Sequence, residues 1–307
     1  MAISTIDGSK TLYTFFPEAT AGTPAAGAYQ TLRCKAGAKF ELARNTFTSA
    51  DLRADRMESS LSYGTKSGSL TLPIEWSYGT YDTLLEATMG GTWAVGVPAL
   101  GSDTLLVGNA ARTLTFEETS GGFVEQSVGA TLGGFTISKK TDAIVEGDFS
   151  GVFMNTTTAA TAATSVAAAT TNPAFDSLTG TITDDAGVIT YISGWDLKVE
   201  QEVSPNFALG SDSAQSTSLG VVKVSGSINA YFVDNTLRDK YINGTPTTLA
   251  LVLGDATTGT LAFEMNTVKY THNTRDNNPL ARMETLNFVA TYTLADLSSL
   301  KITRTAA

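Results

Sequence analysis

Few residues of this sequence have the types and spacing that catalysis or metal binding requires. The chain has one histidine, His272, and one cysteine, Cys34. A serine or cysteine nucleophile activated by imidazole would have to use His272, and zinc normally needs several histidine or cysteine ligands. His272 lies in the polar run Thr271–Pro279, which we interpret as a solvated loop between strands. We therefore expect no catalytic residue, no metal site and, with a single cysteine, no intrachain disulfide.

Two groups of acidic residues are the remaining candidates for chemistry. The run Asp184–Gly187 has residue types suited to calcium, but the spacing of the EF-hand pattern is missing, and a hairpin turn is the simpler interpretation. Glu117, Glu118 and Glu125 are candidates for a pair of catalytic carboxylates of the glycosidase type. Nothing visible in the sequence raises the pKa of one of them, so we favour a solvated strand edge.

The densest charge cluster consists of Arg53, Asp55 and Arg56, within the segment Ala50–Met57. As a phosphate-binding group it is too small and too mixed in sign. As an exposed loop it would form local ion pairs worth about 0–1 kcal/mol each. A third interpretation, a loop that contacts another subunit, also fits these residues.

Composition excludes several classes of function. The chain has 307 residues, which suggests two domains, and 42% hydrophobic residues, enough for a core in each. The net charge is −10, and no cluster of lysine and arginine suited to gripping nucleic acid is visible. Met1–Lys10 does not have the pattern of a signal peptide, and no apolar run is long enough for a membrane helix. We expect a soluble chain made in the cytoplasm.

The elements that would position these residues are mainly β-strands. Apolar and polar residues alternate in short runs bounded by Gly, Asn, Asp and Ser, which is the strand pattern. Two segments predict short helices, Tyr81–Met89 and Thr236–Ile242, stopped by Gly90-Gly91 and Asn243-Gly244 respectively. The clearest alternating runs are Ser67–Ile74, Thr113–Phe116, Gly134–Ser138, Trp195–Val199, Lys223–Ile228 and Leu286–Ala290.

These elements indicate an internal repeat. The run Ser67–Leu70 recurs as Ser225–Ile228, 158 positions later, and Leu84 stands at the same distance from Ile242. Two further matches follow in the same order: Thr113–Glu117 with Thr260–Glu264, and Asp148–Phe153 with Asn287–Tyr292. One such match could arise by chance, whereas four in the same order predict a duplication.

The repeat predicts the domain boundaries. The segment Asn155–Ala174 is almost entirely Thr, Ala, Ser and Asn, so it reads as an exposed linker or surface loop. The expected division is a first domain at 1–155, a linker at 156–174 and a second domain at 175–307. In each domain a long polar stretch precedes the Ser-Gly-Ser strand, at Asn45–Lys66 and Asn206–Val222, and we expect both stretches to be contact loops. The self-association residues predicted on them are Arg53, Asp55, Arg56, Phe207 and Asp212.

The sequence resembles the major tail tube proteins of siphophages over nearly the whole chain. The resemblance rests on an ordered combination of segments. These are Leu52–Arg56, Ile74–Ala87, Gly90–Trp93, Gly226–Phe232, Leu237–Asn243, Phe263–Tyr270 and Leu286–Tyr292.

The resemblance implies a mainly β fold of two tandem tail-tube-type β-sandwich or barrel domains, each with one short α-helix. In this family four strands per domain join those of neighbours into an inner barrel. A duplicated chain would need three copies per ring, with pseudo-sixfold symmetry, and a hexamer is the fallback. The implied partners are further copies, a tape measure protein, a tail terminator and double-stranded DNA that passes without tight binding.

The resulting expectation is a structural subunit of a bacteriophage tail tube, located in the virion tail, made in the host cytoplasm, with no enzymatic activity, cofactor or membrane. An adhesin built from tandem β-sandwiches is the alternative, because Thr-, Ser- and Asn-rich loops suit surface binding. A glycosidase on a β scaffold is the third hypothesis, which the internal repeat disfavours.

Overall fold

The structure is a computed structural model, and it describes residues 8–24, 26–51, 54–55, 57–159, 161–163, 165–277, 280–294 and 297–307. The fold is mainly β, as predicted. Its described α-helices are α1 (Asp82–Met89) and α2 (Thr236–Asn243), at the two predicted positions. Each ends at a glycine in the left-handed conformation, Gly90 or Gly244, which confirms the predicted stops.

The strands of the first half run from the N-terminal region to the Thr- and Ala-rich segment. A 3-10 turn at Gly8–Lys10 precedes them. They are β1 (Leu12–Pro17), β2 (Tyr29–Thr31), β3 (Lys39–Thr48), β4 (Leu61–Glu75), β5 (Ala94–Val95), β6 (Ser102–Leu106), β7 (Leu114–Ser120), β8 (Phe123–Lys140), β9 (Glu146–Phe153), β10 (Asn155–Ala159) and β11 (Val166–Ala167).

The described part of the second half contains eight strands. They are β12 (Ile182–Asp184), β13 (Gly187–Val188), β14 (Ile192–Asn206), β15 (Ser216–Tyr231), β16 (Thr247–Asp255), β17 (Gly259–Asn277), β18 (Arg282–Ala290) and β19 (Lys301–Thr305).

The strand pairings of the first half recur in the second half. β3–β4 corresponds to β14–β15, β4–β9 to β15–β18, and β8–β9 to β17–β18. β1–β2, β1–β7, β7–β8 and β8–β10 likewise correspond to β12–β13, β12–β16, β16–β17 and β17–β19. The helix follows the fourth strand of each set. The two halves therefore share one pattern of strand pairing, with β5, β6 and β11 as additions to the first half.

Eight strands form one row across both halves, in the order β3, β4, β9, β8, β14, β15, β18, β17. The halves join where β8 pairs antiparallel with β14, from Lys140 opposite Gly194 to Gly134 opposite Glu200. A second join pairs β6 with β19. Each half contributes four of the eight strands, and the row is continuous through the join.

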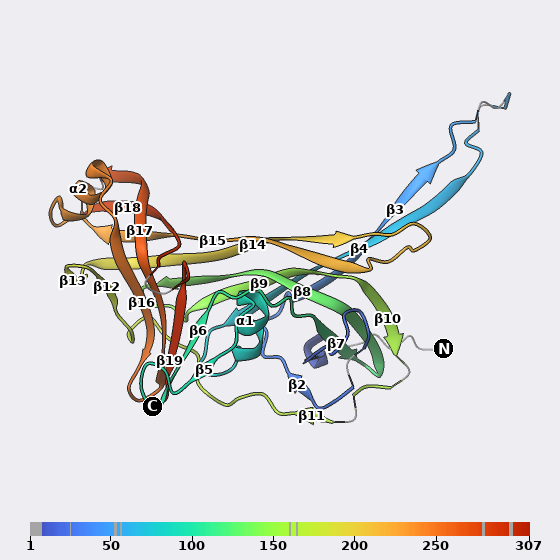
Figure 1. Ribbon diagram of the computed structural model, residues 1–307, viewed down its shortest axis with the longest axis horizontal. Coiled ribbons are helices and arrows are strands. Elements are labelled where there is room, and N and C mark those ends of the chain that lie inside the picture. Colours follow the sequence, from blue (N-terminus) through green and yellow to red (C-terminus); the bar gives the residue numbers. More distant parts are fainter. Residues whose placement is uncertain are drawn as a thin grey trace.

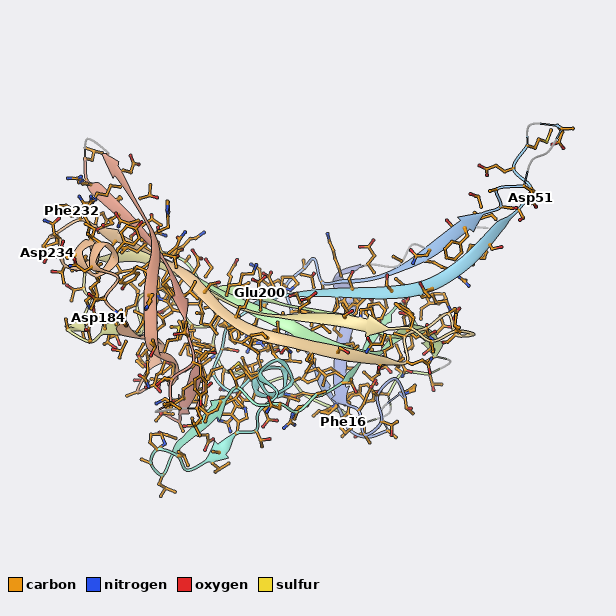
Figure 2. All side chains as sticks on the ribbon, turned by 45° about the horizontal axis from the view of Figure 1, so that its top comes forward. Phe16, Asp51, Asp184, Glu200, Phe232 and Asp234 are labelled. Atoms are coloured by element: carbon orange, nitrogen blue, oxygen red, sulfur yellow. The ribbon has the colours of Figure 1, made fainter. Side chains whose placement is uncertain are left out.

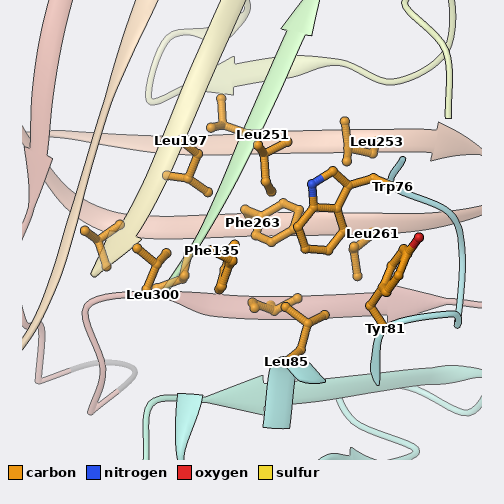
Figure 3. Close-up of a cluster of buried hydrophobic side chains, with 14 of the residues drawn as sticks. Trp76, Tyr81, Leu85, Phe135, Leu197, Leu251, Leu253, Leu261, Phe263 and Leu300 are labelled. Carbon is orange, nitrogen blue, oxygen red and sulfur yellow. The ribbon is translucent and has the colours of Figure 1, made fainter. Parts of the chain in front are cut away.

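One hydrophobic core extends through both halves (Figure 3). Trp76 of the first half lies at its centre, with ring centroids 5.7 Å from Phe135 and 6.2 Å from Phe263, and Phe263 belongs to the second half. The indole N–H of Trp76 donates to the Thr136 carbonyl at 3.1 Å, so this buried polar group is satisfied. Leu197 of β14, Leu251 of β16 and Leu300, which precedes β19, bring the second half into the same cluster, as Figure 3 shows.

The hairpin of β3 and β4 projects from the body of the molecule as a long arm (Figure 1). The predicted contact loop Asn45–Lys66 is the outer part of this arm, and the stretch Asn206–Val222 is the outer part of the β14–β15 hairpin. Both stretches were predicted as loops, but each begins and ends in a strand: Asn45–Thr48 and Leu61–Lys66 in the first, and Asn206 and Ser216–Val222 in the second. The strand residues of both stretches pair through backbone groups and are largely exposed. They therefore lack the apolar–polar alternation by which a half-buried strand is predicted from sequence.

Two of the four repeat matches are out of register. Thr113–Glu117 spans the start of β7, whereas Thr260–Glu264 lies in β17, the counterpart of β8. Phe153 and Phe288 are equivalent, because they pair with Gly68 and Gly226. The match of Asp148–Phe153 with Asn287–Tyr292 therefore joins the correct strands at the wrong positions. Alternating apolar residues match in any register that preserves the sheet face, which explains both errors.

The helix match is also displaced. Measured from the glycines that end them, the two helices are 154 positions apart, from Gly90 to Gly244, and not 158. Leu84 is fully buried, while Ile242 is 60% exposed. A shift of four residues is about one helical turn, so a helix-period match cannot detect it.

The Thr- and Ala-rich segment predicted as a linker is anchored to the first half. β10 pairs with β8, and β11 pairs in parallel with β2. The Arg33 guanidinium donates to the carbonyl of Asn172 at 2.7 Å, and the Asn172 side chain donates to the carbonyl of Tyr78 at 2.8 Å. The contacts use backbone groups, so a segment without bulky side chains can make them.

Candidate self-association surface

The row of eight strands ends in two unpaired edges. At one end, β3 pairs with β4, and no other described strand pairs with it. At the other end, β17 pairs with β18 from Tyr270 to Asn277, and no described strand covers its opposite edge there. Unpaired edges present N–H and C=O groups ready to bind another strand. These two edges therefore form the main candidate for association with further copies.

The two edges are counterparts of strands that already pair within the chain. β3 corresponds to β14, and β17 corresponds to β8, and β8 pairs with β14 at the join between the halves. The join within the chain is thus a template for pairing β17 of one copy with β3 of another. Both pairs would be antiparallel.

The β3–β4 arm carries apolar side chains that the rest of the chain does not cover. Phe47, Leu61 and Tyr63 are each more than half exposed, and the Arg44 guanidinium lies 4.5 Å from the Tyr63 ring centroid. Figure 2 shows the arm with Asp51 at its outer end, far from the labelled residues of the body. Exposed apolar side chains gathered on a projecting element are typical of a protein interface.

The outer end of the β14–β15 hairpin rests against the base of this arm. The backbone N–H of Lys66 donates to the carbonyl of Asp212 at 2.7 Å. The Asp212 carboxylate also lies 2.7 Å from Lys66 Nζ and 3.5 Å from Arg44 Nη2. The hydrogen bond from Lys66 lowers the pKa of Asp212, so this carboxylate is charged at neutral pH.

The predicted self-association residues occupy two separate places. Asp55 lies in the turn of the arm, where its carboxylate accepts the Met57 N–H at 3.3 Å, and Arg53 and Arg56 lie outside the described residues. Phe207 and Asp212 lie in the turn of the other hairpin. Phe207 is 40% exposed, whereas Asp212 is engaged by Lys66 and Arg44 of its own chain. The structure thus brings Asp212 to the arm but not to Asp55.

The run Asp184–Gly187 forms the predicted turn. It joins β12 to β13, and Asp184 accepts the Ala186 N–H at 2.9 Å. The Lys240 ammonium contacts both Asp184 and Asp185. Burial lowers the pKa of Lys240, but the hydrogen bonds to the two aspartates outweigh burial and raise it. A lysine already neutralises the carboxylates that a calcium ion would need.

The predicted solvated strand edge is wrong for Glu117 and Glu118, because β7 lies between β1 and β8, whereas Glu125 of β8 is exposed as predicted. Glu117 is buried and accepts hydrogen bonds from Gln126 at 2.9 Å and from the Ala163 N–H at 3.0 Å. Glu118 stands directly opposite Glu125 across the two strands. Burial, and then the charge of Glu125, raise the pKa of Glu118. The contribution of Glu125 to the raised pKa of Glu118 depends on how β7 and β8 are aligned, and this alignment could not be predicted from the sequence alone.

The single histidine and cysteine lie in different halves of the chain, His272 in β17 and Cys34 between β2 and β3. His272 belongs to β17, next to a bulge at Tyr270, so the polar loop predicted around it is strand up to Asn277. Its ring nitrogen Nε2 lies 2.8 Å from the Thr274 hydroxyl. Burial, followed by the charge of Glu118, raises the pKa of Cys34 to about 11, which keeps it a thiol. Within the described ranges, no three His, Cys, Asp or Glu side chains gather as metal ligands would.

The strand edges are the feature that sequence reasoning missed. Their signal was indirect: a duplicated strand plan implies that any contact between the halves can be repeated between copies. The residues of β3 and of Tyr270–Asn277 carry no motif of their own. Edge pairing uses backbone groups, so residue types identify it poorly.

Taken together, these features describe a mainly β protein whose row of eight described strands ends in two unpaired edges. The chain matches the family model described as "Phage tail tube protein" over residues 8–290, and it belongs to that family. No curated protein matches the sequence. Members of this family are structural components of the bacteriophage virion tail and assemble into a tube. In the part of the chain that the structure describes, neither helix has the length and apolar character needed to span a membrane.

Proposed function

We propose that three copies of this chain close into a ring by pairing β17 of each copy with β3 of the next. The observation that carries this proposal is the β8–β14 join, because the same two strand types meet there within one chain. Each copy would contribute two tail-tube-type domains, at 1–155 and 175–307, connected by 156–174. The ring would then have pseudo-sixfold symmetry.

The template also gives a register. Ala43 is the counterpart of Lys198, since these residues stand opposite Ser67 and Ser225. Asp276 is the counterpart of Thr136 when β8 and β17 are aligned through their β9 and β18 partners. Thr136 stands opposite Lys198 at the join. We therefore expect Ala43 of one copy to stand opposite Asp276 of its neighbour.

Closure of the ring would remove both edges and form a barrel. Three rows of eight strands give about two dozen strands. At a strand spacing of ~4.8 Å and a tilt of ~45°, the barrel would be on the order of 50 Å across. This width leaves a lumen through which duplex DNA can pass. Rings stacked by a fixed rotation would form the tube.

The face of the row turned away from the core would line the lumen. It carries hydroxyl and amide side chains, with acids such as Asp148, Asp196 and Glu200 interspersed with Lys198 and Lys223. Asp148 accepts a hydrogen bond from Thr136 at 2.9 Å, and Asp196 accepts one from Ser227 at 3.3 Å. This face is thus a mixed polar surface, in which acidic and basic side chains alternate. It has no basic stripe to replace the counterions of DNA.

The remaining elements of the proposal come from the family. The chain would be made in the host cytoplasm, would surround a tape measure protein during assembly and would be closed by a tail terminator, with no enzymatic step. Arg53, Asp55, Arg56, Phe207 and Asp212 would lie on loops that contact the next ring or subunit. Replacing Arg53 and Arg56 with Glu should block tube growth and leave the subunit folded.

Two measurements test the ring. The mass of an isolated ring, or an electron-microscopy reconstruction without imposed symmetry, should give three chains, and six chains would overturn the proposal. In a Cys34→Ser background, the pair Ala43→Cys and Asp276→Cys should form disulfide-linked oligomers upon oxidation. Either cysteine alone is the control. Compact monomers that bind glycans would favour the adhesin alternative.

A further inference from the structure

A groove of about 910 Å³ lies beside β15 where β18 ends. One wall consists of Leu219–Lys223 of β15, and the other consists of Val289–Tyr292 and Leu297–Ser299. Val221, Tyr292 and Leu297 are each more than half exposed. The groove therefore combines a concave shape with an apolar lining, which suits a protein segment more than water.

The neighbouring place in the first half is filled. Its contact residue Lys66 is the counterpart of Val224, which follows the groove-lining residue Lys223 and pairs with Ala290 of β18. In the first half, β9 ends at Phe153, which stands opposite Gly68 of β4. Beyond this point, at Lys66, the edge of β4 is no longer paired with β9. The turn of the β14–β15 hairpin occupies that edge, because Lys66 N–H donates to the Asp212 carbonyl. The Thr217 hydroxyl lies 2.9 Å from the Thr131 hydroxyl along the same contact. A hairpin thus crosses the ends of β8 and β9 to reach β4.

The repeat identifies the hairpin that would fill the groove. β14–β15 fills the first half because β14 pairs with β8, which directs its hairpin across β9. The counterpart hairpin is β3–β4, and the counterpart of β8 is β17. A β3–β4 arm whose β3 pairs with β17 of a neighbour would cross that neighbour's β18 and reach its β15. The arm of the same chain cannot do so, because β3 and β17 lie at opposite ends of the row.

The arm also has the right surface. Phe47, Leu61 and Tyr63 are more than half exposed on it, although aromatic and branched apolar side chains are usually buried. Burying apolar side chains from both partners stabilises a contact by about 25 cal/mol per Å² of area removed from water. The β14–β15 turn that fills the first half is polar by comparison and is held by Asp212.

We propose that the β3–β4 arm of one copy docks in the groove between β15 and the segments Val289–Tyr292 and Leu297–Ser299 of the neighbouring copy. This inference rests on the proposed ring and adds a second contact to it. The Thr131–Thr217 contact gives a specific pair. Thr217 corresponds to Ser59, through Ser225 and Ser67, and Thr131 corresponds to His272, through the partners Val152 and Asn287. Ser59 of one copy therefore lies against His272 of the next.

Disulfide trapping tests the inference separately from the ring. Full-length chains with Cys34→Ser carry either the arm pair, Ser59→Cys with His272→Cys, or the edge pair, Ala43→Cys with Asp276→Cys. Assembled protein is oxidised and separated on a denaturing gel without reductant. A matched control joins Ser59→Cys to Leu178→Cys, which is exposed but lies on a different part of the second half.

We expect ladders of linked chains from both pairs and none from the control. A ladder from the edge pair without one from the arm pair would overturn the docking of the arm and leave the ring standing. Absence of both ladders would overturn the ring and the docking together.

A groove variant gives an independent measurement. Val221→Glu places a charge in the apolar groove and should lower the yield of tubes several-fold, while circular dichroism shows a folded subunit. Val188→Glu alters an exposed valine on β13 and should assemble normally. Equal tube yields from the two variants would contradict the docking of the arm.

Discussion

Lys66 and Asp212 stand 146 positions apart in the sequence and contact each other twice, through their backbones and through their charged side chains. In the backbone contact, the Lys66 N–H of β4 donates to the Asp212 carbonyl, as it would to a neighbouring strand. The side-chain contact fixes the turn of the second hairpin on the arm of the first. This pair is the place where the two predicted contact stretches meet.

Asp212→Asn should loosen this turn without unfolding the protein. The substitution keeps the backbone hydrogen bond and removes the charge that Lys66 and Arg44 engage. Amide hydrogen exchange of residues 207–215 should become faster at pH 7, with an unchanged melting temperature. Because the pKa of Asp212 is lowered, the contact is complete at neutral pH and is lost as the pH falls through that lowered pKa. Equal exchange of both proteins at pH 7 would show that the ion pair does not hold the turn.

Leu84→Ala and Ile242→Ala should have very different effects, although the two residues are matched in the sequence repeat. Leu84 is fully buried in the core, so its truncation should cost about 2–5 kcal/mol. Ile242 is 60% exposed, so its truncation should change stability by less than about 0.5 kcal/mol. Urea unfolding monitored by tryptophan fluorescence measures both. Similar losses would mean that the helices are equivalent at these positions after all.

Glu118→Gln should stabilise the protein at neutral pH. Like charges opposite each other on paired strands are destabilising by roughly 0.2–1 kcal/mol, and Glu118 faces Glu125. A raised carboxyl pKa means that wild-type stability falls as the pH rises from the unfolded pKa through the folded one. The variant should lack this fall. Thermal melts between pH 4 and 8 check it. Glu125→Gln removes the opposing charge but leaves Glu118 part-buried, so it should give a smaller gain than Glu118→Gln.

Duplex DNA should not bind the assembled protein tightly. The open face of the strand row interleaves carboxylates with lysines, so it offers no continuous positive surface. A mobility-shift assay at physiological salt should show no complex. Replacing Asp148 and Asp196 with Lys should retard DNA, whereas Asn at the same positions should not. Binding by the wild type tighter than about 10⁻⁶ M would contradict a lumen that DNA slides through.

The positions of the helices and strands were predicted more accurately than the alignment of the two halves of the chain. The helices were found because glycines that adopt the left-handed conformation, Gly90 and Gly244, mark their ends. The Ser-Gly-Ser strands were aligned correctly because the tripeptide is distinctive. Repeat matches that rested on alternation alone were misplaced, since apolar alternation recurs every two residues. The tail-tube resemblance was confirmed by the family match.

The surface was harder to predict than the core. The outer edges of β3 and β17 act through backbone groups, and Thr156 or Ala159 of β10 shows how any residue type can take part in such pairing. The contacts of Asp212 with Lys66 and Arg44 within its own chain could not be predicted from the sequence, and its predicted contact with another chain stays a prediction. Its role depends on the distance between two hairpins, which the sequence does not encode locally.

The β5–β6 hairpin gives the two halves of each subunit different outer strand edges. It covers the outer edge of β19, while its absence from the second half leaves β10, the counterpart of β19, with β8 as its one strand partner among the described residues. In a closed ring of three copies, covered and uncovered edges would alternate around the circumference. A protein that recognises the uncovered edge would then have three binding sites per ring instead of six. The outer surface of each ring would have threefold symmetry, so successive rings could be aligned only in ways that respect it.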